Sequence, residues 1–219
     1  MKYTKEEIRN AMLLYAVTDQ SWLKENETLL DVVTDVLKNG ATFLQIREKD
    51  LSEGDFEVEA EKLKDICREH QVPYVVNDNV DIAMHIDADG VHVGQSDIKG
   101  RDIRSMIGNE KILGISAGTV EEAVAAEKAG ADYIGVGAVF DTSTKKNARN
   151  LSMEKLKEIS ESVSIPVVAI GGISASNIME LINSGVDGVA VVSAIFAAEN
   201  PGEAAAKLLE LSKEMVSHE

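Results

Sequence analysis

Short apolar runs rich in β-branched residues alternate with longer amphipathic stretches along the whole chain. Runs of this kind are typical of buried parallel strands, and the stretches between them repeat apolar residues at helical spacing. The runs span residues 13–18, 42–46, 73–76, 90–93, 111–116, 132–137, 166–171 and 187–192. Eight strand–helix units within 219 residues predict an α/β fold, a closed (β/α)₈ TIM barrel, rather than an open doubly wound sheet.

The chain shows no sign of division into parts. No linker, low-complexity segment or change of composition interrupts the alternation, so we expect residues 1–219 to form a single domain. A short extra helix is expected before the first strand. In such a barrel the functional groups lie at the carboxyl ends of the strands, in the loops that follow them.

The chain is acidic, with 38 Asp and Glu against 22 Lys and Arg, and its net charge is −16. Such a charge repels nucleic acid and anionic membranes, so the expected partners are small molecules.

Cys67 is the only cysteine, so an internal disulfide is excluded. It lies in a helical pattern, which predicts a buried side chain. The charged amino terminus and the lack of a long apolar run predict a cytoplasmic protein without a signal peptide. The oligomeric state stays open, and a homo-oligomer is compatible with the sequence.

The second strand ends in the letters QIREK. Side chains alternate along a strand, so Gln45, Arg47 and Lys49 are predicted on the side of the barrel mouth, with Leu44 and Ile46 facing the helices. A polar and basic row that begins inside a buried strand favours an anion-binding site over a surface ion pair.

Two aspartates follow the next two strands. Asp78 comes after Asn77 at the end of the third strand, and Asp97 follows the fourth. Each alone is as well explained by a helix cap or a turn, and Asn79 is an alternative cap. Because neighbouring strands end side by side, the two carboxylates are also placed to share Mg²⁺, which usually keeps waters and ligand phosphates in its shell. His92 lies between two valines and is interpreted as a buried, hydrogen-bonded core residue.

The remaining strands deliver hydroxyl groups, a lysine and glycines. Ser116 ends the fifth strand, and Gly171 and Gly172 follow the seventh, where the main chain can approach a ligand closely. Val192 and Ser193 open a short helical segment after the eighth strand, and this pair of loops is the usual phosphate site of the fold. The sixth strand is followed by Thr142, Ser143, Thr144 and Lys145.

These groups together describe a site for polyanions. The sequence has no Ser–His–Asp arrangement, no zinc-ligand spacing and no dinucleotide-binding glycine motif. Taken in order, the stretches LYAVTD, QIREK, VND, GVHVGQSD, GISAGT, TSTKK, IGGI and VVSAI resemble the thiamin phosphate synthase family from about Leu13 to Phe196. Members of that family are (β/α)₈ barrels that join hydroxymethylpyrimidine diphosphate to a thiazole phosphate and release pyrophosphate.

The resemblance implies a role for each matching residue. Gln45, Arg47, Lys49 and Asn77 would hold the pyrimidine diphosphate, with Ile46 and Glu48 included in the same binding stretch. Asp78 and Asp97 would bind Mg²⁺, and Ser116 and Lys145 would contact the same substrate. Thr142, Ser143 and Thr144 would meet the thiazole phosphate, and its phosphoryl group would rest on Gly172, Val192 and Ser193. Arg47, Lys49, Ser116 and Lys145 would be the catalytic residues.

The implied mechanism is a dissociative, magnesium-assisted loss of pyrophosphate. It requires charge stabilisation and positioning rather than a strong base, and no obvious general base is present. The chain departs from the family at Gly118, where a histidine is common, and at Ala138 and Asp141, where prolines are common.

Three alternatives stay open. A thiazole tautomerase-like paralogue would need a histidine acid or base and would lack the metal-binding set. A sugar-phosphate isomerase or epimerase would need acid–base residues at the strand ends. A phosphate-sensing barrel without catalytic activity is the third alternative.

Overall fold

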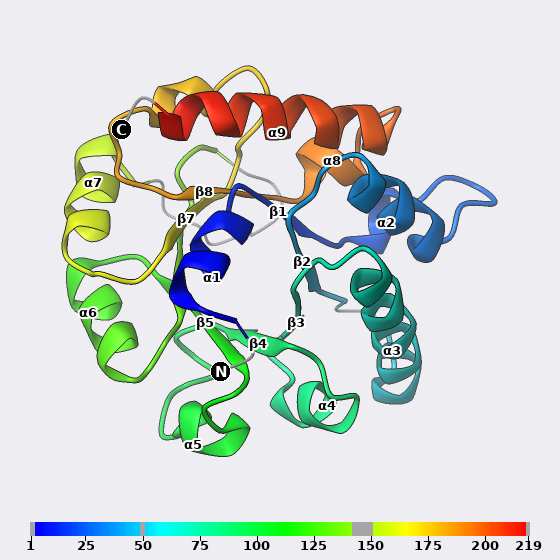
Figure 1. The fold of residues 1–219 in the computed structure, drawn as a ribbon, viewed down its shortest axis with the longest axis horizontal. Helices are drawn as coiled ribbons and strands as arrows, with labels where there is room; N and C mark the ends of the chain where they lie inside the picture. Colours follow the sequence, from blue (N-terminus) through cyan, green and yellow to red (C-terminus); the bar gives the residue numbers. More distant parts are fainter. Residues whose placement is uncertain (1–2, 49–50, 142–150, 218–219) are drawn as a thin grey trace.

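The computed structural model describes residues 3–48, 51–141 and 151–217. Within them, eight parallel strands close into a barrel in the order β1 to β8, each paired with its neighbours in the sequence and β8 paired with β1 (Figure 1). The strands are β1 (Leu14–Val17), β2 (Phe43–Ile46), β3 (Tyr74–Asn77), β4 (Gly90–Val93), β5 (Ile112–Ala117), β6 (Tyr133–Gly137), β7 (Val167–Ile170) and β8 (Gly188–Val191). The predicted (β/α)₈ barrel is therefore confirmed, and each strand begins no more than one residue after its predicted start.

Helices surround the barrel on its outer side (Figure 1). They are α2 (Leu29–Lys38), α3 (Glu53–Glu69), α4 (Val80–His85), α5 (Ile103–Ile107), α6 (Val120–Lys128), α7 (Met153–Glu161), α8 (Ser193–Phe196) and α9 (Pro201–Ser217). Two short 3₁₀ helices, η1 (Gln20–Trp22) and η2 (Ile178–Leu181), follow β1 and β7. Between β7 and β8 the described chain thus forms a 3₁₀ turn in place of a longer α-helix. None of the helices in the described part of the chain is long and apolar enough to cross a membrane.

Side-chain caps fix where the helices begin. Thr28, Ser52, Thr119 and Ser152 each accept a hydrogen bond from the main-chain N–H three residues later, at the starts of α2, α3, α6 and α7. A cap of this kind satisfies one of the N–H groups that the first helical turn leaves without an acceptor. The connections that lead into these four helices therefore end at defined residues.

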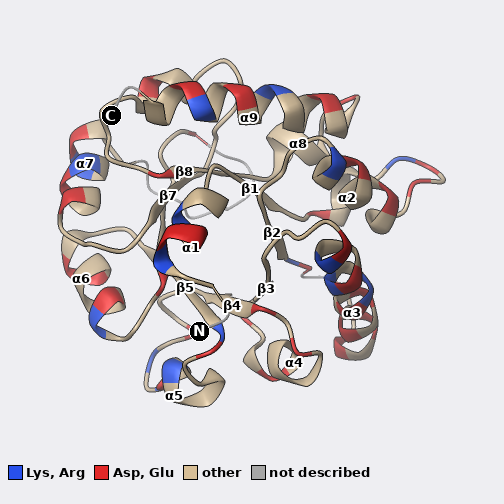
Figure 2. Ribbon diagram, viewed as in Figure 1, with Lys and Arg blue, Asp and Glu red and all other residues tan. Residues whose placement is uncertain are grey.

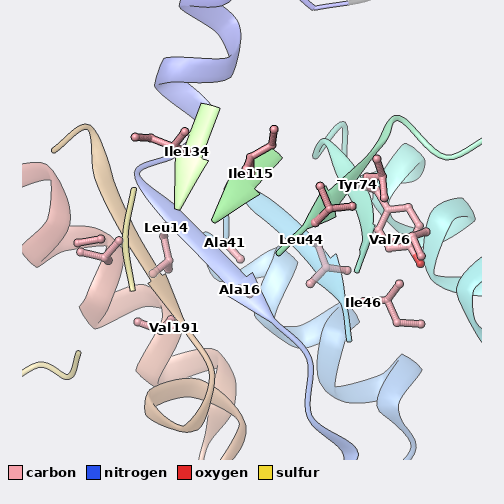
Figure 3. Packing of buried hydrophobic residues seen from close by; sticks show 14 of the residues in the cluster. Leu14, Ala16, Ala41, Leu44, Ile46, Tyr74, Val76, Ile115, Ile134 and Val191 are labelled. Atoms are coloured by element: carbon pink, nitrogen blue, oxygen red, sulfur yellow. The ribbon is translucent and has the colours of Figure 1, made fainter. Parts of the chain in front are cut away.

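Alternation along the strands divides the apolar core into two parts. Leu14, Ala16, Leu44 and Ile46 belong to the cluster that packs against the helices, and Figure 3 shows such outward-facing side chains. Tyr15, Phe43, Val75, Ile112, Tyr133 and Val168 belong to a second cluster inside the barrel. Cys67 is buried with the first cluster, as predicted, and burial raises the pKa of its thiol.

The predicted amino-terminal helix is α1 (Lys5–Ala11), which lies across one opening of the barrel (Figure 1). Its Ile8 and the following Met12 are almost fully buried and join the cluster inside the barrel. Thr4 and Glu7 form a reciprocal capping box at its start. The helix closes the amino-terminal end, which leaves the carboxyl ends of the strands as the open mouth.

Candidate active site

The end of β2 is held by hydrogen bonds to the end of β1. The main-chain N–H of Arg47 donates to Thr18 Oγ1 at 2.9 Å, and that hydroxyl donates to Glu48 Oε1 at 2.9 Å. Gln45 is 4% exposed and points into the barrel, where its amide meets the hydroxyl of Tyr15. The predicted alternation is confirmed, because Leu44 and Ile46 face the helices. Any substrate contact of Ile46 would therefore have to come from its main chain.

Glu48 is turned toward β1 and is half-buried. Burial raises the pKa of its carboxyl group to about 7, the charges of Glu59 and Asp19 raise it further, and the hydrogen bond from Thr18 opposes the shift. The basic neighbour Lys49, predicted as a substrate ligand, lies outside the described residues.

The two alternatives for the end of β3 are separated by the capping contacts. Asn79 caps α4 by accepting the N–H of Ile82 at 2.9 Å, so Asp78 is not the cap. Asp78 has a positive φ of 60°, a conformation that non-glycine residues rarely adopt. Its main-chain N–H donates to the carbonyl of His92 at 2.8 Å, which ties the end of β3 to β4.

Asp78 and Asp97 are brought together, as predicted. Their side chains are in hydrogen-bonding contact, and both partial burial and the Asp97 charge raise the pKa of Asp78. The Asn77 side chain also hydrogen-bonds Asp78 and opposes the shift. Asp97 serves the turn as well, because Oδ2 accepts the N–H of Gly94 at 3.0 Å, and a Cβ at residue 94 would lie 2.9 Å from that oxygen.

This pair fits the requirements of Mg²⁺. Two like charges at one point repel each other, and a divalent cation between them would remove that repulsion. Across the described residues, no group of three or more His, Cys, Asp or Glu side chains is arranged to hold a metal ion. Asp78 and Asp97 would hold the cation with few protein ligands, which suits an ion that takes waters and phosphates for the rest.

Ser116 lies near the end of β5 beside the β4 loop. Gln95 Nε2 donates to its carbonyl at 2.7 Å, and His92 Nε2 lies 2.9 Å from its Oγ. The other ring nitrogen of His92 lies 2.9 Å from the hydroxyl of Tyr133, so the interpretation of His92 as a hydrogen-bonded core residue is confirmed. Gly118, at the position where the family often has a histidine, donates its N–H to Glu122.

The ends of β7 and β8 present mainly main-chain groups. Gly171 and Gly172 have φ values of 101° and 67°, which glycine adopts without strain. A Cβ at residue 172 would lie 2.4 Å from the carbonyl oxygen of Asp141, so this glycine also lets the β7 loop pack on the β6 loop. Val192 precedes α8, and the exposed Ser193 is its first residue. Thr142, Ser143, Thr144 and Lys145 lie outside the described residues.

Sequence reasoning missed two groups at this site. Thr18 is fully buried and connects β1 to both Arg47 and Glu48, although a threonine directly after an apolar run is a weak signal. The tyrosines inside the barrel, Tyr15 and Tyr133, hydrogen-bond each other at 2.8 Å from positions 118 residues apart. Such long-range contacts leave no local pattern in a sequence.

Acidic residues are spread over the outer helices, as Figure 2 shows for α3, α6, α7 and α9. A surface cavity of about 690 Å³ lies where α9 begins and is lined by Glu27, Asp35, Glu199 and Glu203 among others. Four carboxylates with no basic residue in the lining make this cavity unsuitable for a phosphate.

Comparison with known proteins identifies the family of this chain. The sequence profile of the family described as Thiamine monophosphate synthase matches residues 14–195. A thiamine-phosphate synthase of Ruminiclostridium cellulolyticum is 50% identical over 198 residues, which cover 90% of this chain and 94% of that protein. One from Methanobrevibacter smithii is 50% identical over 197 residues, with 90% and 93% covered.

A solved structure supports the same assignment. The thiamine phosphate pyrophosphorylase from Pyrococcus furiosus superposes with a TM-score of 0.87 and is 38% identical, covering 95% of this chain and 99% of that one. The profile, the sequence relatives and the superposed barrel all point to the same family. The chain belongs to the thiamine monophosphate synthase family.

Proposed function

We propose that this chain joins 4-amino-2-methyl-5-(diphosphooxymethyl)pyrimidine to a thiazole phosphate, giving thiamin phosphate and pyrophosphate. The observation that carries this proposal is the Asp78–Asp97 pair, with the Asn77 amide beside it, at the mouth of a barrel of this family. Two carboxylates in contact at one point suit a metal–diphosphate complex rather than a free phosphate group.

The reaction breaks one bond and forms another. The bond between the pyrimidinylmethyl carbon and the diphosphate oxygen breaks with both electrons leaving on the diphosphate. The ring nitrogen of the thiazole then donates its electron pair to that carbon, and the positive charge stays on the thiazolium. No proton has to be removed, so the site needs no strong base.

The residues of this chain would bind and orient the two substrates. Arg47 would pair with the diphosphate, Asn77 and Gln45 would bind the pyrimidine substrate, and Ser116 would donate from the end of β5. Mg²⁺ held by Asp78 and Asp97 would supply positive charge to the leaving diphosphate. Main-chain groups at Gly172, Val192 and Ser193 would hold the phosphate of the thiazole. Lys49, Thr142, Ser143, Thr144 and Lys145 remain predicted contributors.

Among the described residues, no histidine is placed for the proton transfer of a tautomerase-like reaction. A thiazole tautomerase-like reaction moves a proton and would use a histidine. Residue 118, where the family often has a histidine, is here a glycine whose N–H donates a hydrogen bond to Glu122. His92 has both ring nitrogens engaged inside the barrel, so it is poorly placed as the missing acid or base. An isomerase or epimerase would require the same kind of proton transfer.

The test is a direct assay with both substrates and Mg²⁺. Thiamin phosphate and pyrophosphate should appear in equal amounts, and addition of a chelator should stop their formation. If neither product forms with saturating substrates, the proposed activity is wrong. Conversion between thiazole phosphate isomers in the absence of the pyrimidine substrate would favour the tautomerase-like alternative.

A further inference from the structure

An unbroken chain of hydrogen bonds crosses the inside of the barrel. Gln45 Nε2 donates to the hydroxyl of Tyr15 at 2.5 Å, and the Tyr15 and Tyr133 hydroxyls are 2.8 Å apart. The Tyr133 hydroxyl lies 2.9 Å from His92 Nδ1, and His92 Nε2 lies 2.9 Å from Ser116 Oγ. Both ends of this chain are residues assigned above to substrate binding, on β2 and on β5.

The barrel interior is built around this chain. Tyr15 and Tyr133 are at most 1% exposed and His92 is 8% exposed. A Cβ at Gly114 would lie 2.2 Å from Cζ of Tyr133 and 2.6 Å from Nδ1 of His92. A Cβ at Gly135 would lie 3.3 Å from Cε1 of His92. Glycine inside a strand weakens the strand, so these two positions are best explained by the space that the rings require.

The direction of the hydrogen bonds along the chain is set by its first member. The Gln45 nitrogen can only donate, so the Tyr15 oxygen accepts and its own hydrogen goes to Tyr133. In this order Tyr133 would donate to His92 Nδ1, which would leave the imidazole proton on Nε2, directed at Ser116. Burial raises the pKa of both Tyr15 and Tyr133, so each of these hydroxyls keeps the one proton that it donates.

We propose that Tyr15, Tyr133 and His92 are positioning residues that fix the hydrogen-bonding roles of Gln45 and Ser116 toward the substrate. In this order Gln45 offers its carbonyl oxygen as an acceptor, and Ser116 keeps its hydroxyl hydrogen free to donate. The reverse order would exchange both roles together. The proposal rests on the proposed function, because Gln45 and Ser116 are taken as substrate-binding residues.

A direct readout is the protonation state of His92 in the unmodified protein. Long-range proton–nitrogen NMR distinguishes which nitrogen of an assigned imidazole carries hydrogen. We expect a neutral ring with the proton on Nε2. A proton on Nδ1, or on both nitrogens, would overturn the proposed direction. This measurement does not depend on catalytic activity.

A kinetic test uses Tyr133→Phe, which removes the central hydroxyl and keeps the ring. We expect kcat/KM to fall about tenfold, the size of one or two hydrogen bonds. The matched control is Tyr74→Phe, because the Tyr74 hydroxyl is equally buried but donates to the carbonyl of Ala60 at 3.0 Å, on the helix side of β3. The control should lower the thermal midpoint without changing kcat/KM.

Coupling between the two ends separates positioning from general support of the fold. Gln45→Ala and Ser116→Ala should be non-additive in kcat/KM, and they should become additive when Tyr133→Phe is also present. Additivity in the unmodified background would overturn the proposal, as would unchanged kinetics of Tyr133→Phe. Failure of the unmodified protein to form thiamin phosphate would instead refute the proposed function.

Discussion

The two sides of the barrel mouth use different parts of the chain. The ends of β2 to β5 present side chains, including Gln45, Asp78 and Ser116, and hold them by contacts between neighbouring strands. The ends of β7 and β8 present main chain, with glycines at 171 and 172 and the start of α8 at Ser193. On the first side, function depends on the chemistry of side chains. On the second, it depends on where the main chain runs, so substitutions should have different consequences.

The largest effect is expected on the side-chain face, for Asp78→Ala. The variant removes one of two carboxylates in contact and should lower kcat by about 10²–10³, the usual cost of losing a charge-stabilising group. Steady-state formation of pyrophosphate over a range of Mg²⁺ concentrations measures this loss. Asp81→Ala is the matched control, because Asp81 is an exposed carboxylate in the first turn of α4. Equal rates for the two variants would remove Asp78 from the metal site.

On the main-chain face, Gly172→Ala should be nearly as damaging. Its Cβ would lie 2.4 Å from the Asp141 oxygen and 2.8 Å from the carbonyl carbon of Phe140, at a φ of 67°. The β7 loop must move, and misplacement by about 1 Å can cost on the order of 10²-fold in rate. We expect this loss in kcat/KM for the thiazole phosphate.

The control for this variant is Gly100→Ala. Residue 100 has a similar φ of 76°, but nothing lies within 4 Å of the added Cβ. It therefore carries the same backbone strain without the collision. If both variants bind thiazole phosphate equally well, the packing of the β7 loop on the β6 loop does not matter for the site.

Two serines compare the faces directly. Ser116→Ala removes a hydroxyl that receives the His92 contact, and we expect about a tenfold fall in kcat/KM. Ser193→Ala leaves the main-chain N–H in place and should change kcat/KM by less than about threefold, because the exposed hydroxyl is not the proposed phosphate ligand. Parallel measurements with both substrates test the difference. A larger loss at Ser193 would show that the second face also relies on its side chains.

The same contrast explains what the sequence could predict. The alternation of short apolar runs with longer amphipathic stretches was sufficient to predict the eight strands. The alternation of side chains along a strand correctly predicted that Gln45 points into the barrel and Leu44 toward the helices. The choice between Asp78 and Asn79 as a cap could not be made, because both residue types cap helices and only the contact to Ile82 decides. The Tyr15–Tyr133 bond was also out of reach, since it joins strands that only barrel closure brings together.

Glycines were only partly predictable. Gly172 could be assigned to a place of close approach, but its nearest described neighbours are atoms of Phe140 and Asp141. A sequence indicates that a Cβ is not tolerated, and it does not say which atoms would collide with it. The main-chain side of the site therefore needs coordinates, whereas most of the side-chain residues could be identified by type and position.

The smallest expected effect concerns Glu48, on the side-chain face. Its pKa of about 7 in the folded protein lies above the ordinary 4.5, because burial disfavours the charged form. Between these values the folded state holds a proton that the unfolded state has released, so the free energy of unfolding falls as pH rises from about 4.5 to 7 and then levels off.

The variant Glu48→Gln keeps an acceptor for Thr18 and removes the charge. The thermal midpoint of this variant should exceed that of the unmodified protein by a few degrees at pH 8, and the difference should shrink toward pH 5. Glu61→Gln, at an exposed position of α3, should show no such dependence on pH. A lower midpoint for Glu48→Gln at pH 8 would mean that the Glu48 charge stabilises the mouth, and the side-chain face would then tolerate a buried carboxylate better than its surroundings indicate.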